Sequence, residues 1–389
     1  MKKKQVILVA NIPDLLGNQR NSAVYNYLTY LSTLSGNTEV DIHVFPHKTK
    51  SKTEKNNKRS PIVVALALLF KPFPKLKKTL SDFLLLRQQD NFVKRLFEAY
   101  PNPDGILEFY FYGSQLYKEV KKRNLPYTVF YDCPVYDQSI EVTSLHSYYK
   151  TEINRRQLEA LRLANQIIGY SDPVKEFILN TYMVDSNKIR VFPTFIPDDG
   201  IASEFNFDNR DYIGFIGSFL SWHKVDLLIK AFEQIINELP PNAMLVLIGK
   251  GEEWENIEKI VEQSPVNKRI ILTGYVSLNE LRAWRKKIRI GVMPGSNWYG
   301  SPLKLFEYLF AGIPFIAPET PTVTYIFRDN VECLIIKNDN PVDSLSENLL
   351  KLYSNIDLRK ELTANALKRM KTTFSEDKLI QILNNIVEF

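Results

Sequence analysis

One segment of the sequence combines residue types that suit the binding of a phosphorylated ligand. The segment runs Gly300-Ser-Pro-Leu-Lys-Leu-Phe-Glu-Tyr-Leu-Phe-Ala-Gly-Ile-Pro314. Ser301 is a favourable N-cap residue, Pro302 suits the first helical position, and glycine and proline follow where a helix would end. The pattern predicts a helix over 302–311. Its N-terminal amides and positive dipole end can bind a diphosphate.

Two charged side chains on this predicted helix are placed to contact such a ligand. Glu307 lies five residues into the helix, about 7.5 Å along its axis, and helical side chains tilt back toward the N-terminus. Its carboxylate can therefore approach a ribose diol beside the phosphates, and Lys304 adds positive charge on the same turn. The same residues also fit an ordinary capped helix with an exposed Glu307, which would tolerate alanine there.

The elements that position this helix follow from the alternation of short apolar runs with amphipathic segments. The predicted strands are 5–10, 40–45, 105–109, 127–131, 166–170 and 188–192, then 212–217, 244–248, 270–273, 290–293 and 314–317. The predicted helices are 22–34, 82–100, 114–123, 148–164, 172–182, 225–239, 253–263 and 278–286. The alternation predicts an α/β protein with parallel sheets and helices on both faces.

The alternation pauses over residues 193–210, which are rich in proline and polar residues and are typical of a linker. Two similar α/β halves therefore flank a hinge. On the second side of it, Leu228, Phe232, Ile235 and Leu239 have the spacing of a core-facing helix stripe. Ligands of doubly wound sheets bind at the carboxyl ends of the strands, so each half is expected to form one wall of a cleft.

Composition narrows the possible classes of protein. The chain has 389 residues, enough for two cores, and a formal net charge of +6. Nucleic-acid signatures are missing, so nucleotide phosphates or an anionic membrane surface fit the basic charge better. Cys133 and Cys333 form no CxxC pair, and the four histidines lack metal-ligand spacing, so we expect neither a disulfide nor a metal. We also expect neither a signal peptide nor a spanning helix.

Four segments together resemble the donor domain of retaining GT-B glycosyltransferases of family 4. They are Tyr212–Phe232, Leu245–Glu252, Ile271–Val276 and Gly300–Ala317. The resemblance covers residues from about 188 onward well and the first half weakly. It implies two Rossmann-like domains facing across a cleft: an acceptor-binding domain over 1–200 and a donor-binding domain over 211–370. The last helix, 377–388, is expected to pack back on the first domain.

The resemblance also implies roles for individual residues. Glu307 would bind the ribose, the amides near Ser301 to Leu303 the diphosphate, and the backbone near Tyr275 and Val276 the base. The expected donor-binding residues are Gly217, Ser218, Lys224, Tyr275, Val276, Tyr299, Gly300, Ser301, Pro302, Leu303, Lys304 and Glu307.

The sequence departs from the family pattern at three of its positions. Tyr299 stands where the family commonly has a glutamate eight residues before Glu307, and Ser218 and His223 stand where it often has arginine and lysine. Lys224, one residue later, offers a replacement charge. These departures also admit a catalytically weak binding subunit.

The predicted catalytic residues are Asp132, Glu108 and His223. Asp132 follows the strand 127–131, where the family often has a His-Asp pair, and Glu108 ends the strand 105–109, on the same rim. In the family chemistry, the acceptor hydroxyl attacks on the face that the nucleotide leaves, and the diphosphate takes the proton. Helix amides with Lys224, Lys304 or His223 would balance its charge, so no metal or other cofactor is expected.

The expected function is transfer of a sugar from a UDP- or GDP-linked donor to a hydroxyl of a glycan or lipid-linked acceptor, with retention. A GT-B sugar-nucleotide epimerase is the alternative enzyme. Residues 62–70 are apolar and Lys71, Lys75, Lys77 and Lys78 follow. They form either a strand or helix that leads into a solvated loop, or a segment that contacts an anionic leaflet. We expect a cytoplasmic protein, peripheral on the inner face of the membrane.

Overall fold

The computed structural model describes residues 3–10, 30–31, 33–34, 40–46, 74–109, 113–131, 148–193, 207 and 210–385. These residues form two compact units. The first unit draws on residues 1–170, 174–192 and 377–389, and the second on 171–173 and 193–376. The predicted helix 22–34 falls mostly outside the described residues, and the predicted linker does so almost entirely.

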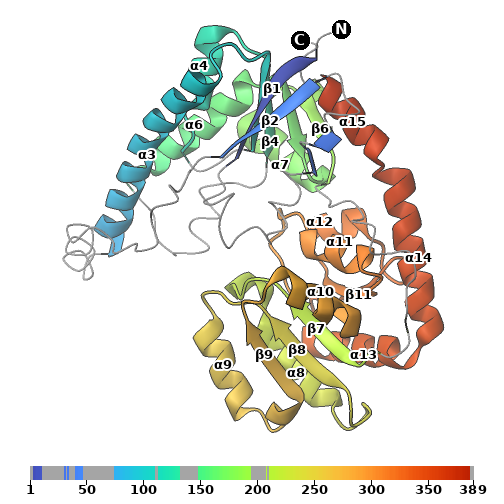
Figure 1. Cartoon of the computed structure of the whole chain (residues 1–389). Coiled ribbons are helices and arrows are strands. Elements are labelled where there is room, and N and C mark those ends of the chain that lie inside the picture. The colour runs from blue at the N-terminus through green and yellow to red at the C-terminus, as the bar shows by residue number, and fades with distance from the viewer. Residues whose placement is uncertain are drawn as a thin grey trace. The chain divides into compact units, whose positions relative to one another are not determined.

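The first unit is built on a parallel sheet of six strands in the order β2-β1-β3-β4-β5-β6. The strands are β1 (Lys4–Ala10), β2 (Val40–Pro46), β3 (Gly105–Phe109), β4 (Tyr127–Tyr131), β5 (Gln166–Gly169) and β6 (Ile189–Val191). Its helices are α3 (Pro74–Ala99), α4 (Leu116–Arg123), α6 (Lys150–Leu163), α7 (Asp172–Tyr182) and α15 (Glu376–Asn384). Figure 1 shows α3, α4 and α6 together on one side of this sheet.

The second unit has a parallel six-stranded sheet in the order β12-β11-β10-β7-β8-β9. The strands are β7 (Tyr212–Ile216), β8 (Met244–Ile248), β9 (Ile270–Gly274), β10 (Ile288–Val292), β11 (Phe315–Pro318) and β12 (Leu334–Ile336). From β7 the chain proceeds one way to β8 and β9, and the other way to β10, β11 and β12. This is the Rossmann strand order, and its topological switch point lies between β7 and β10.

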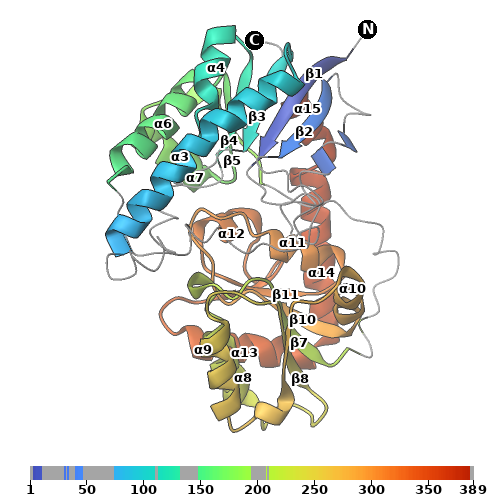
Figure 2. The same cartoon turned by 60° about the vertical axis from the view of Figure 1, so that its left-hand side comes forward.

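The helices of the second unit cover its sheet on both faces. They are α8 (Val225–Ile235), α9 (Trp254–Gln263), α10 (Leu278–Lys287), α11 (Leu303–Phe310), α12 (Pro321–Ile326), α13 (Pro341–Ser354) and α14 (Ile356–Thr373). Figure 2 shows α8, α9 and α13 on one side of the sheet and α10 on the other. The predicted core stripe is confirmed, since Leu228, Phe232, Ile235 and Leu239 are all buried.

The fold class is as predicted, because both units are α/β with parallel sheets. The predicted strands match within one or two residues, since their continuous apolar runs are buried on both faces. One helix differs: α3 begins at Pro74, not at Asp82. Lys75 and Lys78 therefore lie in a helix and not in a solvated loop, and proline serves as its first residue.

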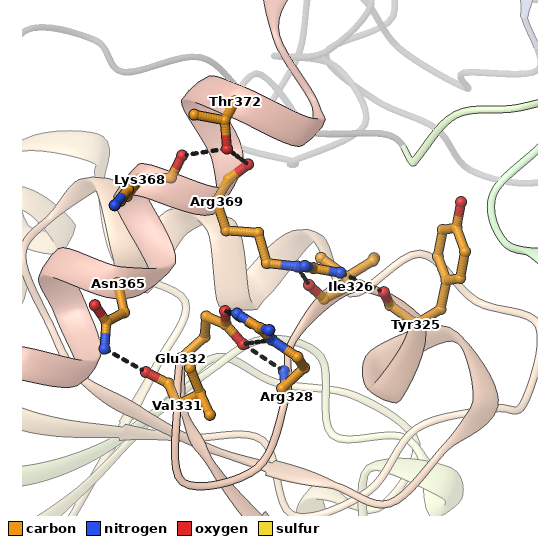
Figure 3. A network of polar contacts seen from close by, with 9 residues as sticks. All are labelled: Tyr325, Ile326, Arg328, Val331, Glu332, Asn365, Lys368, Arg369 and Thr372. Atoms are coloured by element: carbon orange, nitrogen blue, oxygen red, sulfur yellow. Dashed lines mark hydrogen bonds and ion pairs between the residues drawn. The ribbon is translucent and has the colours of Figure 1, made fainter.

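Helix α14 supports the segment that follows α12 through a network of polar contacts (Figure 3). The Arg369 guanidinium donates hydrogen bonds to the carbonyls of Ile326 and Tyr325, at the end of α12. Asn365 donates to the carbonyl of Val331, 3.1 Å away. Arg328 and Glu332 form an ion pair within the segment itself.

Helix α12 in turn contacts the loop after β10. The hydroxyl of Thr322, a fully buried residue of α12, donates to the carbonyl of Trp298 at 2.8 Å. That loop leads directly into α11. No strand or helix is predicted from the sequence over 321–373, yet α12 and α14 from this range support the loop that leads into the predicted binding segment.

Candidate functional site

The predicted donor-binding residues gather at the carboxyl ends of β7 and β10. The loop after β7 contains Gly217 and Ser218, continues through a short 3-10 helix (Ser221–His223), and reaches Lys224 at the start of α8. The loop after β10 leads into α11, which contributes Lys304 and Glu307. Both loops leave the sheet at its topological switch point, the place where doubly wound sheets bind their ligands.

Gly217 allows the side chain of Lys304 to cross the end of β7. Its φ is +153°, and a Cβ atom there would lie 2.0 Å from Cε of Lys304. A Cβ on Gly249, at the end of β8, would lie 2.0 Å from the carbonyl oxygen of Gly217. Both positions therefore require glycine, and the strand ends pack closely around the lysine.

His223 and Lys304 form a hydrogen-bonded pair inside this site. The Lys304 ammonium is 2.8 Å from Nε2 of His223, and Nδ1 of His223 is 2.6 Å from the carbonyl oxygen of Ser218. An ammonium can only donate and a carbonyl can only accept. His223 therefore accepts through Nε2 and donates through Nδ1, which makes it a neutral imidazole.

Burial controls the charge of both partners. Burial and the nearby Lys304 charge lower the pKa of His223 to about 3. Burial also lowers the pKa of Lys304 to about 8, against the opposing effect of the Glu307 carboxylate. In this arrangement the neutral imidazole adds no positive charge of its own, so Lys304 and Lys224 are the cations of the site, while the expected catalytic role of His223 stays a prediction. Its two ring nitrogens contact the Lys304 ammonium and the Ser218 carbonyl.

Lys224 adds a second, exposed cation beside this pair. It adopts a left-handed conformation with φ of 47° at the start of α8. A Cβ on Gly295 would lie 2.4 Å from the carbonyl of Trp222 and 2.9 Å from Cγ of Lys224. The loop after β10 thus packs directly on the segment that contains Lys224.

Helix α11 begins one residue later than predicted. It starts at Leu303 with Pro302 in the N-cap position, so the expected cap by Ser301 is wrong. The Leu303 amide lies 2.9 Å from the Ser301 carbonyl and is engaged within the chain. Proline has no N–H group. A diphosphate at this end of α11 would therefore depend more on side-chain cations, and less on helix amides, than the sequence predicts. Gly300, just before Ser301, presents no side chain toward such a ligand.

Glu307 is paired and largely shielded, not exposed. Its carboxylate lies 3.1 Å from the guanidinium of Arg285 in α10, and the two side chains are 11% and 15% exposed. Arg285 is not among the residues predicted from the sequence. A usable signal was its position four residues after the buried Leu281, which places an arginine on the inner face of the helix.

Tyr308, the next residue, fixes α11 against the sheet. Its buried hydroxyl accepts a hydrogen bond from the Ile216 amide at 2.8 Å, at the end of β7. A Cβ on Gly291 of β10 would lie 2.5 Å from the Tyr308 ring. Burial raises the pKa of Tyr308 well above its usual range. These contacts of Tyr308 fix the position of α11, and so of Lys304 and Glu307, relative to the ends of β7 and β10.

The remaining predicted donor contacts differ in exposure. Tyr299 is 2% exposed, and its hydroxyl accepts from Asn297 at 2.9 Å, so it lies within the loop and not at its surface. Tyr275 is 81% exposed and follows β9 together with the half-buried Val276. These two residues directly precede Ser277, whose side chain caps α10.

Among the predicted catalytic residues of the first unit, Asp132 lies outside the described residues. Glu108 is described, and its expected place on a rim is wrong: the carboxyl is fully buried and accepts a hydrogen bond from the Tyr127 hydroxyl. Burial raises its pKa to about 7, partly opposed by the nearby polar side chains of Ser114 and Tyr127. A group without solvent access has no path to an acceptor hydroxyl in this arrangement.

This buried carboxyl predicts a pH-dependent stability of the first unit. Because the pKa is near 7 in the folded state and near 4.5 otherwise, the folded state holds the proton more tightly. The protonated Glu108 carboxyl therefore stabilises the folded state fully below pH 4.5, and this stabilisation is lost as the pH rises through about 7. Glu108→Gln should therefore raise stability near pH 8 by up to about 3 kcal/mol, and change little near pH 4.5.

Denaturant unfolding of the Gln variant and the wild type at both pH values measures this effect. Glu98→Gln, at an exposed position of α3, is the matched control and should leave the pH dependence unchanged. Parallel stability curves for the wild type and Glu108→Gln would contradict the assignment.

One family model matches the part of the chain that contains this site. Residues 199–369 match the family model described as Glycosyl transferases group 1. An uncharacterized glycosyltransferase of Methanocaldococcus jannaschii is 24% identical over 233 residues, which cover 58% of this chain and 58% of that relative. The chain thus matches less than two thirds of the length of this curated relative. Both findings support a transferase enzyme.

Solved structures show the fold of the whole chain. Sucrose-phosphate synthase from Thermosynechococcus elongatus superposes with a TM-score of 0.71 at 16% identity, covering 99% of this chain and 98% of that one. The Anabaena protein HepE in complex with UDP gives a TM-score of 0.63 at 11% identity, with 98% of each chain covered. The fold is therefore GT-B, with two Rossmann-like domains.

Within the described residues, no group of three or more His, Cys, Asp or Glu side chains is arranged to hold a metal ion. The helices described also include none with the length and apolar character needed to span a bilayer.

Proposed function

We propose that the chain is a glycosyltransferase that moves a sugar from a nucleotide-sugar donor to a hydroxyl of a glycan or lipid-linked acceptor. The observation that carries this proposal is the convergence of Gly217, Lys304 and Glu307 at the switch point of the second sheet. That point lies inside the region that matches the glycosyl transferase family. A cation and a carboxylate side by side suit a diphosphate joined to a ribose.

The second unit, over residues 211–370, is the proposed donor domain. Lys304 and Lys224 contact the diphosphate, Glu307 accepts hydrogen bonds from the ribose hydroxyls, and the segment at Tyr275 and Val276 meets the base. HepE, which shares the fold, is in complex with UDP. UDP-linked sugars are therefore the first donors to test, followed by GDP-linked sugars.

The proposed chemistry retains the configuration of the anomeric carbon, as in family 4. The acceptor hydroxyl attacks on the face from which the nucleotide departs, and the leaving diphosphate takes the proton. The contribution of the protein is to stabilise the charge growing on the diphosphate, through the ammonium groups of Lys304 and Lys224. With two cations at this place, the proposal requires no divalent metal.

The first unit, over residues 1–200, is the proposed acceptor domain. An anionic membrane surface is its proposed partner, because α3 exposes apolar and basic side chains together near its start. The exposed fractions of Leu76, Phe83 and Leu84 are 44%, 36% and 46%, and Tyr148 is 66% exposed. The Lys75 ammonium lies 4.6 Å from the centre of the Tyr148 ring. The predicted apolar segment 62–70, with Lys71, lies outside the described residues.

Sedimentation with vesicles tests this surface. Changing Lys71, Lys75, Lys77 and Lys78 to Gln should weaken binding to anionic vesicles at low salt by roughly tenfold or more, since each basic residue near the surface contributes about 1 kcal/mol. Lys78 contributes least, because it is paired with Asp82 at 2.8 Å. The control changes four exposed lysines elsewhere: Lys259, Lys268, Lys360 and Lys371. Equal binding by both variants and the wild type points to a soluble acceptor.

A catalytically weak binding subunit is the second candidate. The observation that favours it is that Tyr299 is buried where the family has a glutamate, while Ser218 offers no charge to a phosphate. Screening nucleotides for a thermal shift tests both candidates for the site itself. UDP or GDP should stabilise the wild type, and adenine nucleotides at equal concentration should do so less. Stabilisation by none of them would contradict the proposed site.

A further inference from the structure

Helix α10 holds one arginine at the inner edge of the proposed nucleotide site. The helix is fixed at its start by a capping box, in which Ser277 and Glu280 bond each other's backbone amides. It is fixed along its length by the buried Leu281 and by Trp284, whose ring meets that of Tyr212 at 5.4 Å. Arg285 lies one turn beyond Leu281, so it points the same way, toward α11.

The ion pair between Arg285 and Glu307 is short and mostly withdrawn from water. The guanidinium and carboxylate lie 3.1 Å apart, with side-chain exposures of 15% and 11%. Salt screens such a pair weakly, and loss of one partner leaves the other charge shielded and unbalanced. Within the part of the chain that the structure describes, Nε of Arg285 is buried and has no hydrogen-bond partner. The contact of Arg285 with Glu307 is therefore mainly an ion pair made through one end of the guanidinium.

We propose that Arg285 is a positioning residue that orients the Glu307 carboxylate for ribose and thereby makes the site selective for ribonucleotides. This inference rests on the proposed function. A glutamate side chain has several rotamers, and an arginine beside it favours the ionised form and restricts its direction. Because α10 starts just after Tyr275 and Val276, the pair also joins the segment proposed for the base to the helix proposed for the ribose.

Titration calorimetry with paired nucleotides tests the role. The probes are UDP and GDP, each compared with its 2′,3′-dideoxy analogue, which has no ribose diol. Arg285→Met keeps the aliphatic stem and removes the charge. It should lower the affinity for the ribonucleotide roughly tenfold, the loss of one charge-assisted hydrogen bond, and change the affinity for the dideoxy analogue little. Arg285→Lys should restore part of the loss.

Two controls separate positioning from a merely structural role. Arg282→Met changes an exposed arginine of the same helix and should leave all affinities unchanged. In a Glu307→Gln background, Arg285→Met should cause no further loss of ribonucleotide affinity, because the arginine acts through that carboxylate. Equal weakening of both nucleotides by Arg285→Met, or an unchanged affinity for both, would overturn the inference.

The outcomes also distinguish this inference from the proposed function. If Glu307→Gln loses ribonucleotide affinity while Arg285→Met does not, the nucleotide site stands and the role of Arg285 is wrong. If the wild type binds neither ribonucleotide, both are wrong.

Discussion

Replacing Glu307 by Ala is expected to lower the affinity for the donor nucleotide by roughly 10- to 100-fold for each ribose hydrogen bond lost, since a bond to a charged group contributes about 1.5–3 kcal/mol. The carboxylate stands on α11 beside Lys304, at the carboxyl ends of β7 and β10. Calorimetric titration of the wild type and the variant with UDP and GDP measures the loss. An unchanged affinity would remove Glu307 from the site.

The same replacement is also expected to destabilise the second unit, in contrast to the sequence expectation of a tolerant exposed position. Glu307 is the partner of the shielded Arg285, and Ala leaves that guanidinium unpaired. A penalty of about 1–3 kcal/mol is typical of such a loss. Glu307→Gln retains an acceptor oxygen and is the matched control, with a smaller effect on both stability and affinity.

Lys304→Met should weaken nucleotide binding about as strongly as Glu307→Ala does. Of these two proteins, the wild type and Lys304→Met, only the wild type should lose UDP affinity as the pH rises above neutral. Burial lowers the pKa of the Lys304 ammonium to about 8, so the lysine is charged below that value and neutral above it. If it contacts the diphosphate, UDP affinity in the wild type falls about tenfold between pH 7 and pH 9. Binding is therefore lost as the pH rises, because the lysine loses its charge.

Lys304→Arg provides the control for this pH dependence, because arginine keeps its charge throughout the range. The ratio of the Lys304→Arg affinity to the wild-type affinity should rise as the pH rises. Because the nucleotide itself titrates equally in both measurements, its titration cancels in this ratio. Parallel pH profiles for the wild type and Lys304→Arg would exclude the ammonium as the titrating group. His223 does not provide the limb, since its pKa is held near 3 and it stays neutral.

Local sequence was enough to predict every described strand except β12, and also the position of α11. Continuous apolar runs such as Val6–Val9 are buried because parallel sheets are covered on both faces. Proline and glycine at the two ends of the α11 segment predicted its limits within a residue, although the N-cap proved to be Pro302. These signals act over a few neighbouring residues, which is why a single sequence contains them.

The charge states and pairings in the site could not be predicted in this way, because they depend on residues far apart in the chain. His223 and Lys304 are 81 positions apart, and they form their hydrogen bond where the Lys304 side chain passes close to Gly217. Arg285 and Glu307 meet across two helices. Glu108 lies near a strand end, as predicted, yet the packing around it removes it from solvent.

Donor turnover by the purified chain tests the central claim most directly. The protein is incubated with UDP-linked and GDP-linked sugars, and release of the free nucleotide and of the sugar is followed over time. We expect nucleotide release from at least one donor, strongly reduced in Glu307→Ala and in Lys304→Met, with the released sugar in the anomeric configuration of the donor. Nucleotide binding without any release would contradict transferase activity and identify a binding subunit, whereas an epimerised sugar would identify an epimerase.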